Sequence, residues 1–95
     1  MTYQGHEADM YQVAYKSQAV KALRRIQPKR AKTIRNAINS LAEDPDSPAL
    51  NVKPLSGRDG FRLRVGDYRV LFDRDDGIKI ISIEKIGPRG DVYKR

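Results

Sequence analysis

Residues 61–86 alternate between apolar and polar side chains, and two short links that contain glycine interrupt the alternation. A period of two is typical of strands that bury one face. The links Gly66-Asp67 and Asp76-Gly77 suit tight turns between antiparallel neighbours. The segments FRLRV, YRVLFDR and IKIISIEKI therefore predict a three-stranded antiparallel meander.

The residues before this meander predict one strand and two helices. YQVAY at 11–15 alternates and is rich in residues that favour strands. Ser17 is placed to cap a short amphipathic helix, and Pro28 is placed at the first position of a second one. The second helix carries a helically spaced apolar stripe of Ala31, Ile34, Ala37, Ile38 and Leu41. Residues 43–60 hold three prolines and two glycines, which predicts a loop.

Together these elements predict a small α+β domain. Its expected order is an N-terminal strand, a two-helix hairpin and the three-stranded antiparallel meander, with the helices on one face of the sheet and the other face open. The length of 95 residues fits one domain. We expect residues 1–9 to be disordered and residues 10–95 to form that domain.

The composition limits the function classes. A net charge of +7 and a pI near 9.9 are typical of proteins that meet phosphate or an acidic partner. The absence of cysteine argues against a disulfide framework and a cysteine zinc site. No apolar run approaches the roughly 18 residues of a membrane span, and the first residues lack the build of a signal peptide. We therefore expect a cytoplasmic protein without membrane contact, metal or cofactor.

Three arginines interrupt the apolar pattern of the first two meander strands. By alternation, Arg62, Arg64 and Arg69 lie opposite the apolar residues of their strands. If the apolar side chains pack under the helices, the arginines gather on the open face, where they repel one another unless a polyanion binds. The alternative is that they are solvated residues of a half-exposed sheet.

Several segments together carry a family resemblance. The order YKSQAVKAL, LAEDP, LSG, FRLRVGDYRVLF and GPRGDVY resembles the RelE toxins of bacterial and archaeal toxin–antitoxin modules, within the RelE/ParE superfamily. The resemblance covers nearly all of residues 10–95. It implies an mRNA interferase, an endoribonuclease that enters the ribosomal A site and cuts the message to a 2′,3′-cyclic phosphate and a 5′-hydroxyl. It also implies a cognate acidic antitoxin and a toxin–antitoxin hetero-oligomer.

The resemblance also implies roles for individual residues. Arg69 matches the family arginine that holds the scissile phosphate, Arg89 the one that stabilises or protonates the leaving 5′-oxygen, and Tyr93 the tyrosine that stacks on a base. Arg62 and Arg64 align with two family lysines, so the charge persists but the ionisable amine does not. Arginine grips phosphate well but is a poor base, because its usual pKa is above 12.

Other residues keep two interpretations each. Glu84 is a conceivable base whose face the pattern does not place, and His6 is expected to be inert. Lys53 and Arg58 could help to bind RNA from the loop. Eight cations and no acid occur in 16–35, and they could either bind RNA or be ordinary solvated residues.

The short acidic and glycine-rich stretches are assigned to turns. DRDDG is interpreted as a charged hairpin turn and SGRDG as a turn in the loop. The predicted function is thus a ribosome-dependent, metal-independent endoribonuclease. Two alternatives remain: a DNA gyrase inhibitor of the ParE branch, and a catalytically inactive module that binds RNA or an antitoxin.

Overall fold

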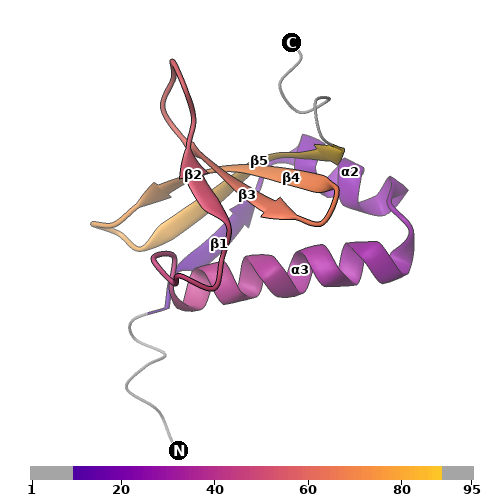
Figure 1. Ribbon diagram of the computed structural model, residues 1–95, viewed down its shortest axis with the longest axis horizontal. Coiled ribbons are helices and arrows are strands. Elements are labelled where there is room, and N and C mark those ends of the chain that lie inside the picture. Colours follow the sequence, from indigo (N-terminus) through magenta and orange to yellow (C-terminus); the bar gives the residue numbers. More distant parts are fainter. Residues whose placement is uncertain (1–9, 89–95) are drawn as a thin grey trace, which may run out of the picture.

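The computed structural model describes residues 10–88, and our expectation for residues 1–9 lies outside them. The elements follow in the order β1, α2, α3, β2, β3, β4 and β5. Their bounds are β1 Gln12–Tyr15, α2 Ser17–Arg25, α3 Pro28–Glu43, β2 Val52–Pro54, β3 Phe61–Val65, β4 Tyr68–Asp75 and β5 Ile80–Pro88. The predicted α+β class and the order of its strand, helices and meander are confirmed (Figure 1).

The five strands form one sheet in the order β1-β5-β4-β3-β2. Strands β3, β4 and β5 pair antiparallel, as predicted, and β1 joins the outer edge of β5 in parallel. The prediction that residues 43–60 form only a loop is wrong, because β2 pairs antiparallel with β3. Proline obscured this strand in the sequence, yet an edge strand tolerates Pro54 because an edge need not donate every ladder hydrogen bond.

The two helices begin close to the predicted positions. Pro28 occupies the first turn of α3, where its missing N–H has no cost. The prediction that Ser17 caps α2 is wrong: Lys16 is the N-cap residue, and among the described residues no side chain forms a capping hydrogen bond there. Within residues 10–88, neither helix is both long and apolar enough to cross a membrane.

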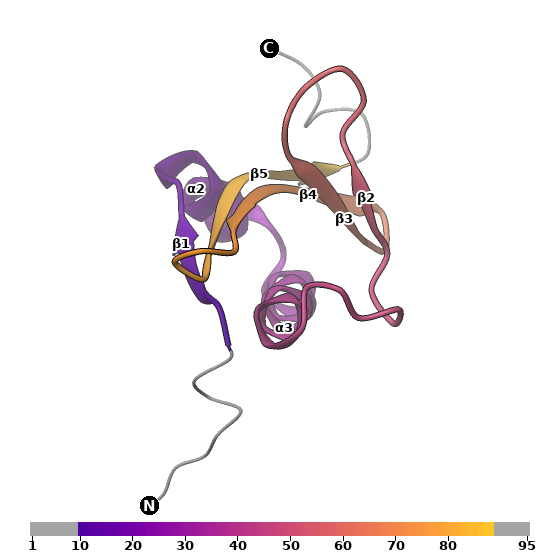
Figure 2. The same ribbon diagram turned by 90° about the vertical axis from the view of Figure 1, so that its left-hand side faces the viewer.

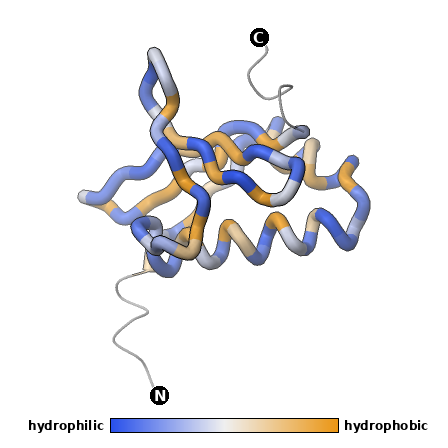
Figure 3. Tube along the Cα trace, in the orientation of Figure 1, coloured by the Kyte–Doolittle hydropathy of each residue, from blue (hydrophilic) through white to orange (hydrophobic). Residues whose placement is uncertain are grey.

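One apolar core lies between the helices and the sheet. Figure 2 shows the curved sheet with α3 beneath it and α2 beside β1 and β5. Figure 3 shows the apolar positions of α3 on its side toward the sheet. The fully buried large residues are Phe72, Ile34, Ile38, Leu41, Leu63, Leu71, Ile81, Ile83 and Val70. All of them except Leu71 belong to this core, and both helices contribute to it, so the helices cover one face of the sheet as predicted.

A β-bulge sets which residues of β5 face the helices. Leu71 pairs with Lys85, whereas the next residue of β4, Phe72, pairs with Ile83, so Glu84 is an extra residue on β5. A single extra residue reverses the alternation beyond it. Ile83 and Ile86 therefore both enter the core, and Lys85 lies on the opposite face.

A polar cluster ties the β4–β5 hairpin to the rest of the chain. Arg74 donates to Asp46 at 2.9 Å and to Asp76 at 2.8 Å, and the Tyr11 hydroxyl donates to Asp76 at 2.8 Å. Lys79 lies 5.0 Å from the centre of the Tyr11 ring. The cluster thus joins the loop after α3, the residue before β1 and the hairpin. The hydrogen bond from Arg74, followed by the one from Tyr11, lowers the pKa of Asp76.

The lowered pKa gives the cluster an acid dependence. Because the folded-state pKa of Asp76 lies below the unfolded value, its contribution to stability is present above about pH 4 and is lost as the pH falls through the folded-state value. We expect Asp76→Asn to lower the free energy of unfolding at pH 7, and the difference from the natural chain to shrink below about pH 4. Urea unfolding across this pH range measures both effects. A difference that stayed constant with pH would contradict the ion-pair account.

Candidate functional site

The face of the sheet away from the helix core carries five cations around one leucine. We call this group the arginine face: Lys53, Arg62, Arg64, Arg69 and Lys85, with Leu71. Its residues lie in two neighbouring rows across the strands. In one row, Lys53 is opposite Arg62, Arg62 opposite Leu71, and Leu71 opposite Lys85. In the other, Arg64 is opposite Arg69, and Arg69 is opposite Gly87. The structure thus brings together Arg62, Arg64 and Arg69 of the predicted site.

Arg69 is the most deeply placed charge of this face. Only 4% of its surface is exposed, although it points away from the helix core. Its Nε and Nη1 atoms are buried and have no hydrogen-bond partner among residues 10–88, and neither has the buried Nε of Arg62. Arg64, directly opposite Arg69, is exposed. A guanidinium carries five donors, so these unpaired nitrogens retain capacity for an acceptor.

The expectation that Arg69 is a surface group on an open face is therefore wrong. Alternation predicts the face on which a residue lies but not its depth. β4 is the middle strand of the sheet, so Arg69 has neighbours on both sides, with Arg64 opposite it on β3 and Lys85 one diagonal away on β5. Long side chains on such positions reach one another and cover the central strand.

Leu71 gives the arginine face an apolar centre. It is fully buried, yet it does not belong to the core between the helices and the sheet. Its neighbours across the strands are Arg62 and Lys85. An apolar, dry centre strengthens electrostatic interactions with the surrounding cations, because the local dielectric constant falls.

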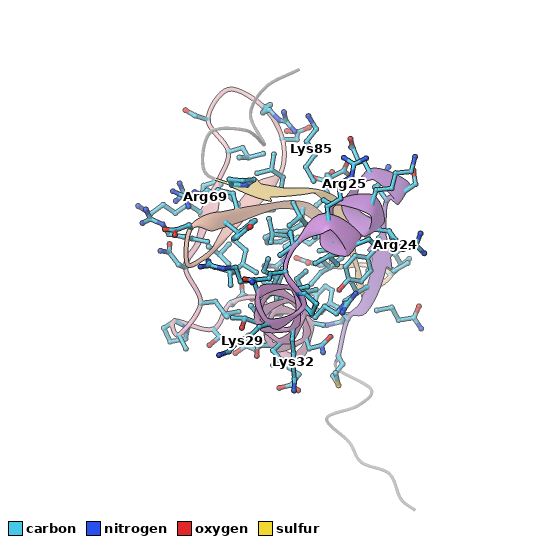
Figure 4. All side chains as sticks on the ribbon, turned by 90° about the vertical axis from the view of Figure 1, so that its right-hand side faces the viewer. Arg24, Arg25, Lys29, Lys32, Arg69 and Lys85 are labelled. Carbon is cyan, nitrogen blue, oxygen red and sulfur yellow. The ribbon has the colours of Figure 1, made fainter. Side chains whose placement is uncertain are left out.

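Lys85 is a member of the arginine face that the sequence pattern does not predict. Strict alternation from Ile81 and Ile83 would direct Lys85 into the core, and the bulge at Glu84 reverses this. A lysine at an expected core position, followed directly by an isoleucine, was the only signal of the bulge. Figure 4 labels Lys85 together with Arg69.

Lys53 and Arg58 have different relations to this face. Lys53 lies opposite Arg62, and both line a small cleft of about 260 Å³. Arg58 is exposed on the loop between β2 and β3, which rises from the sheet on the side away from α3 (Figure 1). The predicted turn in this loop is confirmed, with positive φ angles at Gly57 and Gly60. The structure therefore joins Lys53 to the arginine face, but not Arg58.

Of the remaining candidates, the structure describes only Glu84. Glu84 lies at the bulge and faces Lys16, whose Nζ is 3.9 Å from a Glu84 carboxylate oxygen. This pairing gives no support for Glu84 as a base. Arg89, Tyr93 and His6 lie outside the described residues. Residues 10–88 contain no group of three or more acidic or histidine side chains that could hold a metal.

Comparisons with known proteins place this geometry in a family. The family model of the ParE toxin of type II toxin–antitoxin systems matches residues 13–93. A chain of the archaeal RelE–RelB complex from Pyrococcus horikoshii is 32% identical with a TM-score of 0.74, covering 85% of this chain and 97% of that one. A chain of the RelBE2 toxin–antitoxin complex from Mycobacterium tuberculosis is 26% identical with a TM-score of 0.72, covering 86% and 94%.

A more distant likeness shows the fold alone. The YoeB/ParE toxin from Agrobacterium tumefaciens is 11% identical with a TM-score of 0.70, covering 82% of this chain and 98% of that one. No curated protein sequence matches the chain. The family model spans most of the chain, and the archaeal relative exceeds 30% identity over nearly its full length. The chain therefore belongs to the RelE/ParE superfamily of type II toxin–antitoxin toxins.

Proposed function

We propose that this toxin is an mRNA endoribonuclease that works on the ribosome and uses the arginine face to bind and cleave the message. The single observation that carries the proposal is the burial of Arg69 with two guanidinium nitrogens left without partners. A buried charge without a partner costs several kcal/mol, so a fold retains one where a ligand compensates for it. A phosphodiester is an acceptor that matches the planar guanidinium fork.

The neighbours of Arg69 strengthen this argument. Arg64 stands directly across from it, and like charges in that position destabilise a sheet. Arg62 and Lys85 add positive charge in the next row, on either side of Leu71. A bound phosphate would relieve the repulsion among all four. The arrangement suits stabilisation of the negative charge that develops during phosphoryl transfer.

In the proposed reaction, the 2′-oxygen of a nucleotide forms a bond to the neighbouring phosphorus, and the bond from phosphorus to the 5′-oxygen breaks. Arg69 would hold the scissile phosphate, and Arg62, Arg64 and Lys85 would neutralise its charge in the transition state. Arg89 would stabilise the leaving 5′-oxygen, which becomes a hydroxyl by taking up a proton from Arg89 or from water, and Tyr93 would stack on a base. The 2′ proton would pass to water or to ribosomal RNA, because the chain offers no assigned base.

The partner we propose is an acidic antitoxin. Two of the solved relatives are toxins in complex with an antitoxin, namely archaeal RelE with RelB and the mycobacterial RelBE2 pair. The net charge of +7 favours an acidic partner. A segment that folds on binding could cover much of so small a domain and block the arginine face.

A second candidate function follows from the family description, which names ParE toxins. This alternative is inhibition of DNA gyrase without RNA cleavage. Primer extension on a message translated by purified ribosomes, beside a gyrase supercoiling assay, separates the two. Our proposal expects new message ends and unchanged supercoiling. Loss of supercoiling activity without new ends would overturn it, and neither effect would favour an inactive binding module.

Replacing Arg69 tests whether its buried charge lowers the free energy of unfolding and also supports cleavage. We expect Arg69→Met to raise the free energy of unfolding by about 1 to 3 kcal/mol, because it removes an uncompensated buried charge at similar volume. The same variant should lose cleavage by a factor on the order of 10² to 10³, because one electrostatic contact of the transition state is missing. Urea unfolding and single-turnover cleavage on programmed ribosomes measure the two effects.

Arg64→Met is the matched control, since Arg64 lies on the same face but is exposed. Its free energy of unfolding should rise by less than about 1 kcal/mol, because an exposed charge loses only its repulsion with Arg69. A less stable Arg69→Met protein would mean that the guanidinium supports the fold, and that its burial is structural. Full cleavage in a folded Arg69→Met protein would remove the residue from the site.

Tyr93 is tested by comparing two substitutions. Stacking on a base requires the ring and not the hydroxyl, and it contributes roughly 1 to 3 kcal/mol. Tyr93→Phe should therefore cut as fast as the natural chain, and Tyr93→Ala should cut at least about tenfold more slowly with an unchanged thermal midpoint. Equal losses of thermal stability and of cleavage in Tyr93→Ala would assign the tyrosine to the fold instead.

A further inference from the structure

A second group of side chains lies beside the cations of the arginine face, where the β2–β3 loop leaves the sheet. We call it the loop-side subsite: Leu55, Gly60, Asp73 and Ser82. The loop rises from the sheet on the side away from α3, so it forms a wall next to the arginine face (Figure 2). Its two ends are fixed to each other, because the Leu55 N–H donates to the Gly60 carbonyl at 2.9 Å. The base of the wall therefore has a defined position.

Leu55 is an apolar side chain outside the core. It is partly exposed, and it is not among the described residues that pack in or against the core between the helices and the sheet. It lines the cleft of about 260 Å³ together with Lys53 and Arg62 of the arginine face. Leu55 thus offers a ligand an apolar surface beside two cations.

Asp73 places a carboxylate next to this apolar surface. A Cβ at Gly60 would lie 3.1 Å from Oδ1 of Asp73 and 3.2 Å from Cδ1 of Leu55, so the two side chains meet over the bare backbone of Gly60. Gly60 also has a φ of 110°, which side-chain-bearing residues rarely adopt. A glycine at this position therefore keeps the carboxylate and the leucine side by side.

The Asp73 carboxylate has no partner in the described part of the chain. It is exposed, and among residues 10–88 it forms no hydrogen bond or ion pair. A carboxylate opposes phosphate binding by the neighbouring cations, so a face that bound only the RNA backbone would gain from its loss. A carboxylate accepts hydrogen bonds and does not donate them. Apart from the 2′-hydroxyl, the donors of single-stranded RNA lie on the base edges.

Ser82 adds a second polar group to the same place. It lies directly opposite Asp73 on β5, so both side chains are on the arginine face. A serine hydroxyl can donate as well as accept. An acceptor beside a donor matches an amino group next to an unprotonated ring nitrogen, which cytosine has at N4 and N3 and adenine at N6 and N1. Uracil has a carbonyl oxygen, O4, in place of the amino group, and this oxygen would repel the carboxylate.

The loop-side subsite is separate from the position proposed for the scissile phosphate. Asp73 is four residues from Arg69 on β4, which is about 13 Å along the strand. Arg62 lies opposite Leu71, midway between these two residues. A phosphate held by Arg62 would therefore connect a base in the subsite to the phosphate at Arg69.

We propose that the loop-side subsite recognises one base of the message beside the cleavage site, and selects cytosine or adenine against uracil by the amino group. The base packs on Leu55, its amino group donates to Asp73, and its ring nitrogen accepts from Ser82. The proposal rests on the proposed function in taking the ligand to be RNA. It gives the toxin a sequence preference that the chain itself determines.

The test compares two 2′-O-methyl hexanucleotides, one of cytidine and one of uridine, neither of which can be cleaved. A homopolymer presents the same base at every position, so the result does not depend on which nucleotide enters the subsite. Fluorescence anisotropy measures binding to the full chain at about 50 mM salt, where backbone contacts are strong. Asp73→Asn changes the subsite. Glu43→Gln is the matched control, because it removes one exposed carboxylate at the end of α3, away from the arginine face.

We expect the natural chain and the Glu43→Gln control to bind the cytidine strand at least about fivefold more tightly than the uridine strand. In Asp73→Asn this preference should fall to within about twofold, because an amide accepts from an amino group and also donates to a carbonyl. An adenosine strand should show the same dependence on Asp73. Leu55→Ser should weaken binding of all strands at least about threefold and keep the preference for cytidine. Circular dichroism checks that each variant folds, and Asp73→Ser replaces Asp73→Asn if the latter unfolds.

Four results would overturn the proposal. They are a natural chain that binds the cytidine and uridine strands equally or binds neither, an undiminished preference in Asp73→Asn, an equal loss of preference in the Glu43→Gln control, and an adenosine strand that does not respond to Asp73. Cleavage plays no part in this assay. A chain that kept the preference but cut no message on ribosomes would lose the nuclease assignment and retain the subsite, whereas a chain that cut without the preference would lose the subsite alone.

Discussion

One extra residue in β5 determines how the two faces of this sheet are divided. Without the bulge at Glu84, Lys85 would point into the core and Ile86 would point out. With the bulge, Ile83 and Ile86 pack in the core on the helix side, and Lys85 lies on the same face of the sheet as the arginines. The bulge also sets Gly87, which has no side chain, opposite Arg69. The core and the arginine face thus depend on the same register.

The arginine face opposes the stability of the fold. Arg64 and Arg69 lie opposite each other on neighbouring strands, and within the described part of the chain the buried nitrogens of Arg62 and Arg69 make no hydrogen bond. A protein selected only for stability would replace such a group by an apolar residue. At the other end of β4, Arg74 shows the contrasting case, because it is paired with Asp46 and Asp76. The same strand therefore carries one arginine that is paired with two carboxylates and one whose buried nitrogens have no partner among residues 10–88.

Much of this arrangement follows from the sequence. Alternation predicts the meander and the side on which Arg62, Arg64 and Arg69 lie, because the period of a strand is fixed by its geometry. Pro28 predicts the start of α3.

The sequence does not predict the features that depend on tertiary pairing. β2 contains a proline and has three residues, so only its pairing with β3 identifies it. Lys85 reaches the arginine face through a bulge that alternation cannot anticipate. The burial of Arg69 follows from the position of β4 in the sheet, and local sequence does not encode it.

The central claim is that the unpaired guanidinium nitrogens of Arg69 and Arg62 donate hydrogen bonds to a phosphodiester. Nitrogen-15 NMR of the arginine Nε–H groups tests it most directly, during titration with a 2′-O-methyl trinucleotide that cannot be cleaved. The account predicts that the Nε–H signals of Arg69 and Arg62 shift together and exchange more slowly with water. Arg74 is the internal reference, because its Nε already donates to Asp76 at 2.8 Å and should not respond. Unchanged Arg69 and Arg62 signals, or equal shifts of exposed arginines such as Arg24, would contradict the account.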